Sequence, residues 1–186
     1  MTRRARTVLV ACAALVLAGC ARRTPELRYY TLAVPGAPAR ALDAPVRVGP
    51  FSADPPYTTA RLAYRTSPYR LDYYVYHRWA ADPRQVVASA VRDYLEQPTR
   101  DPRGEPFEVQ GHVRRLEEVD EADGRSGAVA LDLRVERGGR LVLERSYAAT
   151  EPAEGRGPEA TTAALSRALG RILDRLTADL AGATGG

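Results

Sequence analysis

The chain is poor in the residues from which metal sites and disulfide frameworks are built. It has two cysteines, two histidines and no lysine in 186 residues, because all 27 basic residues are arginine. Two cysteines exclude a disulfide-dense scaffold and a multi-cysteine zinc module. Two histidines argue against a histidine-rich metal site. The apolar content of 45% and the charged content of 27% still describe an ordinary globular protein rather than a disordered one.

The sequence motifs of several enzyme classes are also missing. There is no glycine-rich phosphate loop, so the chain is not itself an ATPase, and no HExxH, CxxC or Gly-x-Ser-x-Gly motif. His77 and His112 stay as candidate bases or metal ligands, and a structural or capping role is favoured for His77. The acidic run from Glu117 to Asp123 lacks the spacing of a calcium loop and predicts a solvated hairpin loop. We expect no enzyme activity, no metal and no cofactor.

The first twenty residues have the features of an export signal rather than of a fold. Three arginines precede an uncharged run from Thr7 to Ala18, which is too short to span a bilayer and typical of the apolar region of a signal peptide. The run ends in Leu17-Ala18-Gly19-Cys20, which resembles a bacterial lipobox, cleaved between Gly19 and Cys20. The thiol of Cys20 would then carry a diacylglyceryl group. An ordinary secretory signal with a chance cysteine is the alternative.

Removal of this leader changes the charge balance of the protein. The leader holds three arginines and no acids, so the net charge falls from +4 to 24 − 23 = +1 in a mature chain of 186 − 19 = 167 residues. No basic run exceeds two residues, so the electrostatic footprint of a nucleic-acid-binding protein is missing. The length suits one domain. We assign residues 1–19 to a lipoprotein signal peptide, 20–26 to a lipidated tether and 27–182 to the domain.

The mature chain contains strand patterns that alternate with two amphipathic helices. Residues 27–32 are rich in β-formers, and Val46–Val48 predicts a short strand that Pro50 breaks. Residues 61–65 and 69–76 predict a hairpin. A helix is expected after Asp82, an N-cap followed by Pro83 at the first helical position.

The second half of the chain repeats this order of strands followed by a helix. Residues 107–119 predict a strand, and 128–136 and 140–147 predict a hairpin around Gly138-Gly139. A leucine-rich helix is expected from about Pro158 to Leu180. The order favours an α+β fold, a single antiparallel or mixed β-sheet with two amphipathic helices packed on one face.

A cluster of aromatic residues is the most unusual feature of the predicted domain. Tyr74 and Tyr76 are expected on one face of their strand, with Tyr73 and Val75 on the other. Two helices cannot cover both faces of a sheet, so an interface role and a half-solvated core are weighed equally. Trp79 is expected to pack at the helix entrance. The candidate interface residues are Tyr57, Tyr64, Tyr69, Tyr73, Tyr74, Tyr76 and Trp79.

Three segments together resemble a known family. The lipobox Cys20 is followed by Arg28-Tyr29-Tyr30-Thr31-Leu32. The aromatic strand then leads into His77-Arg78-Trp79-Ala80 and a helix, and the later hairpin and the leucine-rich helix follow in order. This is similar to the ABC-type transport auxiliary lipoproteins, which include the paraquat-inducible protein C lipoproteins. Phe51 to Ala60 departs from the family's usual leucine-proline…arginine-proline-glutamine-isoleucine type of segment, so no partner contact is carried over there.

The resemblance implies a role in transport and not a reaction. Such lipoproteins accompany systems that move lipids or other hydrophobic molecules between two membranes, with an ABC ATPase, a permease and an MCE-domain periplasmic protein as partners. A homo-oligomer is one form that the resemblance implies. Ala21, in place of an aspartate after Cys20, favours the outer membrane, where the acyl chains of Cys20 would enter the bilayer facing the periplasm. Such a subunit would contribute to membrane integrity.

Two other functions remain open from the sequence. One is an envelope assembly or peptidoglycan-synthase-activating lipoprotein of similar shape, which fold alone does not exclude. The other is a membrane-tethered periplasmic hydrolase that would use His77, with Asp72 nearby, or an acidic pair. The three hypotheses differ in the partners and in the chemistry that they require.

Overall fold

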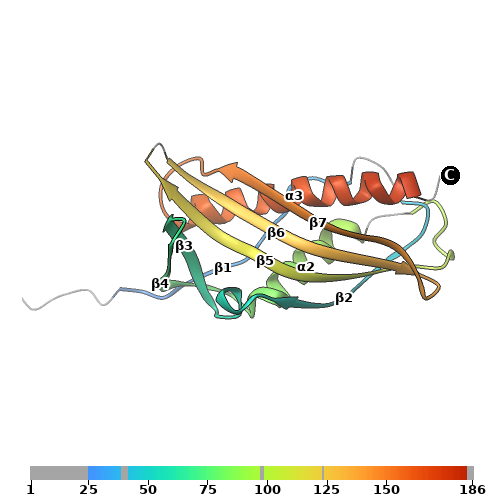
Figure 1. Ribbon diagram of the computed structural model, residues 1–186, viewed down its shortest axis with the longest axis horizontal. Coiled ribbons are helices and arrows are strands. Elements are labelled where there is room, and N and C mark those ends of the chain that lie inside the picture. Colours follow the sequence, from blue (N-terminus) through green and yellow to red (C-terminus); the bar gives the residue numbers. More distant parts are fainter. Residues whose placement is uncertain (1–24, 39–41, 97–98, 123, 184–186) are drawn as a thin grey trace, which may run out of the picture.

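A computed structural model describes residues 25–38, 42–96, 99–122 and 124–183 of the chain. In these residues one mixed sheet is accompanied by two α-helices and a 3-10 turn (Figure 1). The elements in chain order are β1 (Arg28–Tyr30), β2 (Val46–Ala53), η1 (Pro55–Tyr57), β3 (Arg61–Ser67), β4 (Arg70–Trp79), α2 (Pro83–Leu95), β5 (Phe107–Glu121), β6 (Gly124–Arg137), β7 (Arg140–Pro152) and α3 (Pro158–Ala183).

The seven strands of the described residues form one sheet organised around β5. The order is β1-β4-β3-β5-β6-β7, and β2 also pairs with β5. β5 is long enough for two parallel neighbours on one edge, since β2 pairs with its first half and β3 with its second half. The hairpins β3–β4, β5–β6 and β6–β7 are antiparallel, and β1 joins β4 in parallel. The sheet is therefore mixed, within the predicted fold class.

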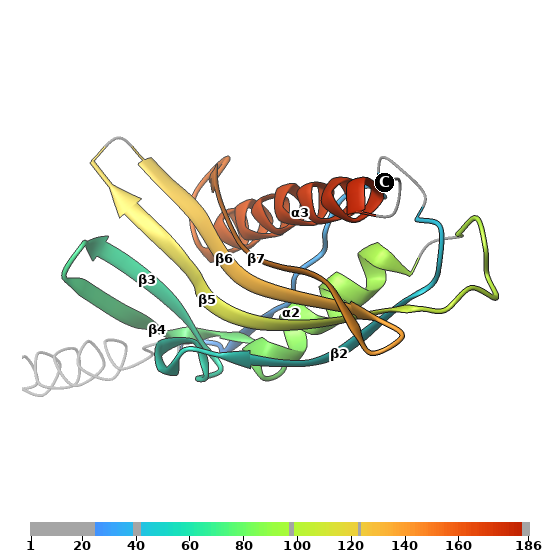
Figure 2. The same ribbon diagram turned by 45° about the vertical axis from the view of Figure 1, so that its right-hand side comes forward.

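Both helices pack on the same face of this sheet, which we call the inner face (Figure 2). α3 lies along β6 and β7, and α2 contacts β2. The helices also meet, because the Tyr94 hydroxyl of α2 donates to Asp174 of α3 at 2.6 Å. The predicted leucine-rich helix has an apolar stripe that is buried throughout, with every member at most 1% exposed: Leu165, Leu169, Ile172, Leu173, Leu176 and Leu180. These contacts confirm the α+β prediction.

Local sequence signals place most of the elements where they were expected. Asp82 caps α2 by accepting a hydrogen bond from the Arg84 backbone N–H at 2.9 Å, and Pro83 occupies the first turn. Gly138 and Gly139 have φ values of 60° and 70°, which a type I′ hairpin turn requires.

The predicted end of the strand at Val48 is wrong, because β2 continues through Pro50. The pairing of β2 with β5 shifts register between Val48 and Phe51, so a bulge takes the proline out of the ladder and the strand resumes to Ala53. Proline lacks a backbone N–H and is tolerated within a strand at such a bulge. The sequence showed the proline but not the irregularity that accommodates it.

Candidate functional site

The predicted aromatic cluster divides into three groups by exposure. Tyr57 and Trp79 are buried, at 6% and 3% exposure, so the prediction of an interface role is wrong for these two residues within a single chain. Tyr57 is buried because η1 folds it back onto the sheet, and Trp79 belongs to the main core at the entrance of α2. The half-buried residues are Tyr64, Tyr73 and Tyr74, and the exposed ones are Tyr69 and Tyr76.

Two adjacent glutamates on β5 organise the buried and half-buried tyrosines. The predicted solvated loop is wrong here, because Glu117 and Glu118 are 0% and 2% exposed within a strand. Successive strand residues point to opposite faces, so the two carboxylates reach opposite sides of the sheet. The acidic run therefore begins with two buried glutamates, continues through half-buried Asp120 and becomes exposed at Glu121. Asp123, which the same prediction included, lies outside the described residues.

Glu117 accepts hydrogen bonds on the outer face from a phenol and two guanidinium groups. The donors are the Tyr57 hydroxyl at 2.6 Å, Arg65 Nε at 2.6 Å and Arg115 Nε at 2.7 Å. Burial alone raises the pKa of this carboxyl, but the hydrogen bonds from the three donors outweigh it and hold the pKa of Glu117 below its usual range. Burial and the neighbouring carboxylate raise the pKa of Tyr57, which stays protonated. The site is a satisfied ion-pair network.

Glu118 is likewise a hydrogen-bond acceptor, on the inner face of the sheet. It accepts from the Tyr74 hydroxyl at 2.8 Å and from the Thr161 hydroxyl at the start of α3. Arg125 of β6 lies 3.5 Å from the same carboxylate. Glu118 therefore ties β4, β6 and α3 together through β5. A carboxylate this enclosed by donors is positioned for structure rather than for proton transfer.

Rings from three strands form a continuous row beside Glu118. The ring centroids of Tyr64 and Tyr74 lie 4.8 Å apart, those of Tyr74 and His77 5.3 Å, and those of His77 and Tyr30 5.6 Å. The Tyr30 hydroxyl and His77 Nδ1 are 2.8 Å apart. Burial and the positive charge of Arg28 lower the pKa of His77, which favours the neutral ring. These contacts agree with the structural role predicted for His77.

A bulge in β4 interrupts the alternation that the sequence predicted for its tyrosines. Ala63 of β3 pairs with Tyr73, but Arg61, only two residues earlier, pairs with Arg78. The odd spacing between Tyr74 and His77, whose rings touch, requires the same irregularity. Tyr74 is consequently half-buried against Glu118, whereas Tyr76 is 41% exposed. The prediction that Tyr74 and Tyr76 share one face is wrong for this reason.

The second histidine belongs to a polar set that sequence spacing did not reveal. His112 of β5 lies opposite Ser52 of β2, with 2.7 Å between its Nδ1 and the serine Oγ, and its Nε2 is 2.8 Å from Asp54 Oδ1. Ser52 and His112 line an open groove of about 390 Å³. The hydroxyl–imidazole–carboxylate order is that of a nucleophilic triad. The side chains of His112 and Asp54 are 35% and 43% exposed, whereas a triad carboxylate is buried.

The described residues hold no group of three or more histidine, cysteine, aspartate or glutamate side chains that could bind a metal ion. The same part of the chain contains no helix of the length and apolar character needed to cross a membrane. Gly19 and Cys20, the predicted cleavage and lipidation positions, lie outside the described residues. Their assignment stays a prediction.

Comparison with known proteins points to one family. A family model described as "ABC-type transport auxiliary lipoprotein component" matches residues 30–177. The fold is similar to a crystal structure of the DUF330 protein XCC0632 from Xanthomonas campestris, at 18% identity and a TM-score of 0.60 over 81% of this chain and 92% of that one. A crystal structure of an uncharacterized protein matches at 13% identity and a TM-score of 0.65, over 83% and 99%. No curated protein matches the chain.

Proposed function

Because this chain belongs to the family of ABC-type transport auxiliary lipoprotein components, we propose that it is a non-catalytic lipoprotein subunit of an ABC/MCE-type lipid-transport complex in the cell envelope. The family match over residues 30–177 carries the proposal. The coarser role, an accessory of an ABC-type transport system, follows from the family itself. The lipid cargo, the MCE-domain partner and the outer membrane are the finer parts of the proposal.

The chemistry of the site supports a role in assembly rather than in catalysis. The two enclosed carboxylates, Glu117 and Glu118, are saturated by donors from neighbouring strands and from α3. Groups held in this way fix the positions of strands and aromatic rings. The result is a rigid sheet with exposed aromatic side chains, which is a suitable surface for contact with other subunits.

The anchor is the part of the proposal that the sequence supports directly. Cleavage between Gly19 and Cys20 and acylation of Cys20 would leave the domain on a short tether. Metabolic labelling with an alkyne fatty acid should mark the wild-type protein and leave Cys20→Ser unlabelled. Inhibition of signal peptidase II should cause the larger precursor to accumulate. A precursor of unchanged size and an unlabelled wild-type protein would contradict the lipoprotein assignment.

The partner is tested by affinity purification from crosslinked membranes. The wild-type chain should recover an MCE-domain protein together with an ABC ATPase and permease. An acylated protein of similar size from the same membranes serves as the control for nonspecific capture. Recovery of peptidoglycan synthases instead would favour the envelope-assembly alternative. Recovery of neither group, in membranes where the transport complex itself stays intact, would overturn the proposed partnership.

Ser52, His112 and Asp54 support a second candidate, a tethered hydrolase. If Asp54 accepts from Nε2, the free Nδ1 of His112 can take the proton of the Ser52 hydroxyl. The exposure of the set argues against it, since water screens the carboxylate and solvates the hydroxyl. A fluorophosphonate probe should not label the protein. Labelling that Ser52→Ala removes and Ser146→Ala retains would establish the hydrolase instead.

A further inference from the structure

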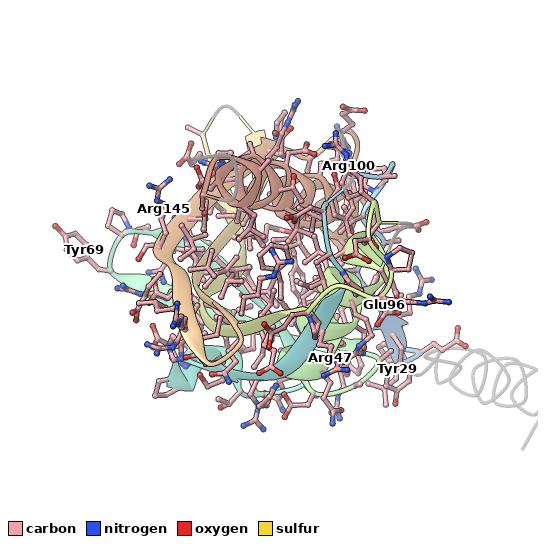
Figure 3. All side chains as sticks on the ribbon, turned by 90° about the vertical axis from the view of Figure 1, so that its right-hand side faces the viewer. Tyr29, Arg47, Tyr69, Glu96, Arg100 and Arg145 are labelled. Atoms are coloured by element: carbon pink, nitrogen blue, oxygen red, sulfur yellow. The ribbon has the colours of Figure 1, made fainter. Side chains whose placement is uncertain are left out.

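Exposed apolar side chains are concentrated where the domain meets its tether. Of the six large hydrophobic residues exposed in the described residues, four lie just before β1, on β1 or on the part of β4 close to it: Leu27, Tyr29, Val75 and Tyr76. Tyr29 is the most exposed of these at 61%. The other two, Tyr69 and Leu141, lie at hairpin turns elsewhere. Figure 3 shows Tyr29 and Tyr69 on opposite sides of the molecule.

Strand register places three of these side chains on one face. β1 and β4 are parallel, with Arg28 opposite His77 and Tyr29 opposite Arg78. Continued by one residue, this register brings Leu27 beside Tyr76. Directly opposed residues of paired strands point to the same face.

Two arginines complete this face. Arg78 lies opposite Tyr29 on one side and opposite Arg61 of β3 on the other. Arg61 is exposed and Arg78 is half-buried. We call Leu27, Tyr29, Tyr76, Arg61 and Arg78 the β1 patch. It combines apolar and phenolic surface with two positive charges in three adjacent strands.

We propose that the β1 patch lies on the anionic surface of the bilayer into which acylated Cys20 inserts. This inference depends on the proposed function, because it requires an anchor at Cys20. Six residues lie between Cys20 and Leu27, and the seven Cα-to-Cα steps of an extended chain reach at most about 25 Å. The tether therefore keeps β1 near the membrane and presents this edge of the sheet to it.

The chemistry of the β1 patch matches a lipid headgroup region. Tyrosine has an apolar ring and a polar hydroxyl, which is why it is enriched where hydrocarbon meets water. Guanidinium groups beside such rings attract anionic phospholipids, and each one near a charged surface strengthens binding by about fivefold. Acyl chains anchor the protein without fixing its orientation. Contact through the β1 patch would orient the domain on the membrane.

Vesicle flotation tests this contact apart from acylation. The mature chain, residues 20–186 with Cys20→Ser, should float with vesicles of phosphatidylethanolamine and phosphatidylglycerol at 3:1. It should bind pure phosphatidylcholine vesicles at least fivefold more weakly, and salt should reduce binding. Tyr29→Ser with Tyr76→Ser should lower binding at least tenfold, and Arg61→Gln about fivefold. Tyr69→Ser is the matched control, since Tyr69 is 97% exposed on the far side.

Several outcomes would overturn the proposal. One is that the parent chain does not bind vesicles, and another is that Tyr69→Ser loses as much binding as the double variant. A third is that the double variant is a monomer by light scattering where the parent chain is a dimer, while vesicle binding is unchanged. The last result would make the patch a contact between copies. Far-ultraviolet circular dichroism confirms that each variant is folded. Acylation of wild-type Cys20 without vesicle binding would reject the patch alone, whereas a chain that is never acylated would reject the proposed function.

Discussion

At the scale of single residues, the buried carboxylate of Glu117 is the group on which most local structure depends. It receives hydrogen bonds from η1, β3 and β5 itself. Glu117→Ala would remove this acceptor from the buried phenol of Tyr57 and from two partly exposed guanidinium groups. We expect a loss of about 1–3 kcal/mol in the free energy of unfolding, because the buried phenol loses its acceptor while water still reaches the two guanidinium groups. Urea denaturation measures it, and Glu121→Ala, exposed on the same strand, should change stability by less than 0.5 kcal/mol or so.

His77 gives the protein a pH dependence of known sign. Its pKa in the fold lies below the value of about 6.5 expected for an unfolded chain, because burial and Arg28 disfavour the charged ring. The folded protein therefore binds fewer protons than the unfolded one, and stability falls as the pH drops from about 7 towards 5. His77→Asn should flatten this slope in melting temperatures measured at pH 7.5 and 5.0. Equal slopes for both proteins would contradict the assignment. The lowered pKa of Glu117 affects stability in more acidic solution, where its carboxylate becomes protonated.

The residue scale also shows where sequence patterns stop being informative. Asp82, Pro83 and the Gly138-Gly139 pair act through their own backbone, so their positions were predictable. Glu117 and Glu118 were assigned to solvent because their neighbours in sequence are acidic. Their partners, such as Tyr57 and Thr161, lie some 40 to 60 residues away in the chain. A buried charge is identified by such distant partners, which spacing along the sequence does not contain.

At the scale of elements, the packing of α3 on the sheet depends on the close approach of its backbone to Gly127 of β6. A Cβ atom added there would lie 2.5 Å from the Leu165 backbone nitrogen and 2.9 Å from the Ala164 carbonyl carbon. Gly127→Ala should therefore push α3 away from β6 and cost about 1–3 kcal/mol in stability. Gly182→Ala, with open space at its Cβ, should be neutral or stabilising by less than about 1 kcal/mol. Thermal unfolding of both variants checks this, and a neutral Gly127→Ala would show that the helix can shift freely.

Element types were predictable and their arrangement was not. The helical stripe from Leu165 to Leu180 and the hairpins β3–β4 and β6–β7 follow from local periodicity and turn residues. The three parallel pairings of β1, β2 and β3 join segments with no sequence relation to one another. The candidate site lies beside one of these non-local pairings, that of β3 with the second half of β5. The sequence therefore identified the tyrosines of the site, while the carboxylates that hold them came from the structure.

At the scale of the whole molecule, the two ends of the sheet differ in protection. An exposed strand edge invites pairing with another chain, and natural proteins cover such edges with charged side chains. Along β7, two arginines of α3 cover backbone acceptors: Arg167 donates to the Pro152 carbonyl and Arg175 to the Ala148 carbonyl, each at 2.6 Å. The three-residue strand β1 is at the other end, beside the proposed membrane contact. The β7 edge is thus covered by side chains of α3, whereas the β1 edge lies at the proposed contact with the membrane.

Removal of the two edge arginines should expose β7 to pairing between copies. The double variant Arg167→Ala with Arg175→Ala leaves two backbone carbonyls of β7 without these donors. Because an open strand edge is a template for another strand, we expect the variant to associate as its concentration rises. Light scattering between about 10 and 200 μM measures this association. Stability should change by less than about 1 kcal/mol per arginine, because both side chains are near the surface. Arg171→Ala is the matched control: it lies on the same helix but pairs with the Glu151 side chain, so it should leave the oligomeric state unchanged. Association of the control to the same extent, or none in the double variant, would show that the arginines do not guard this edge.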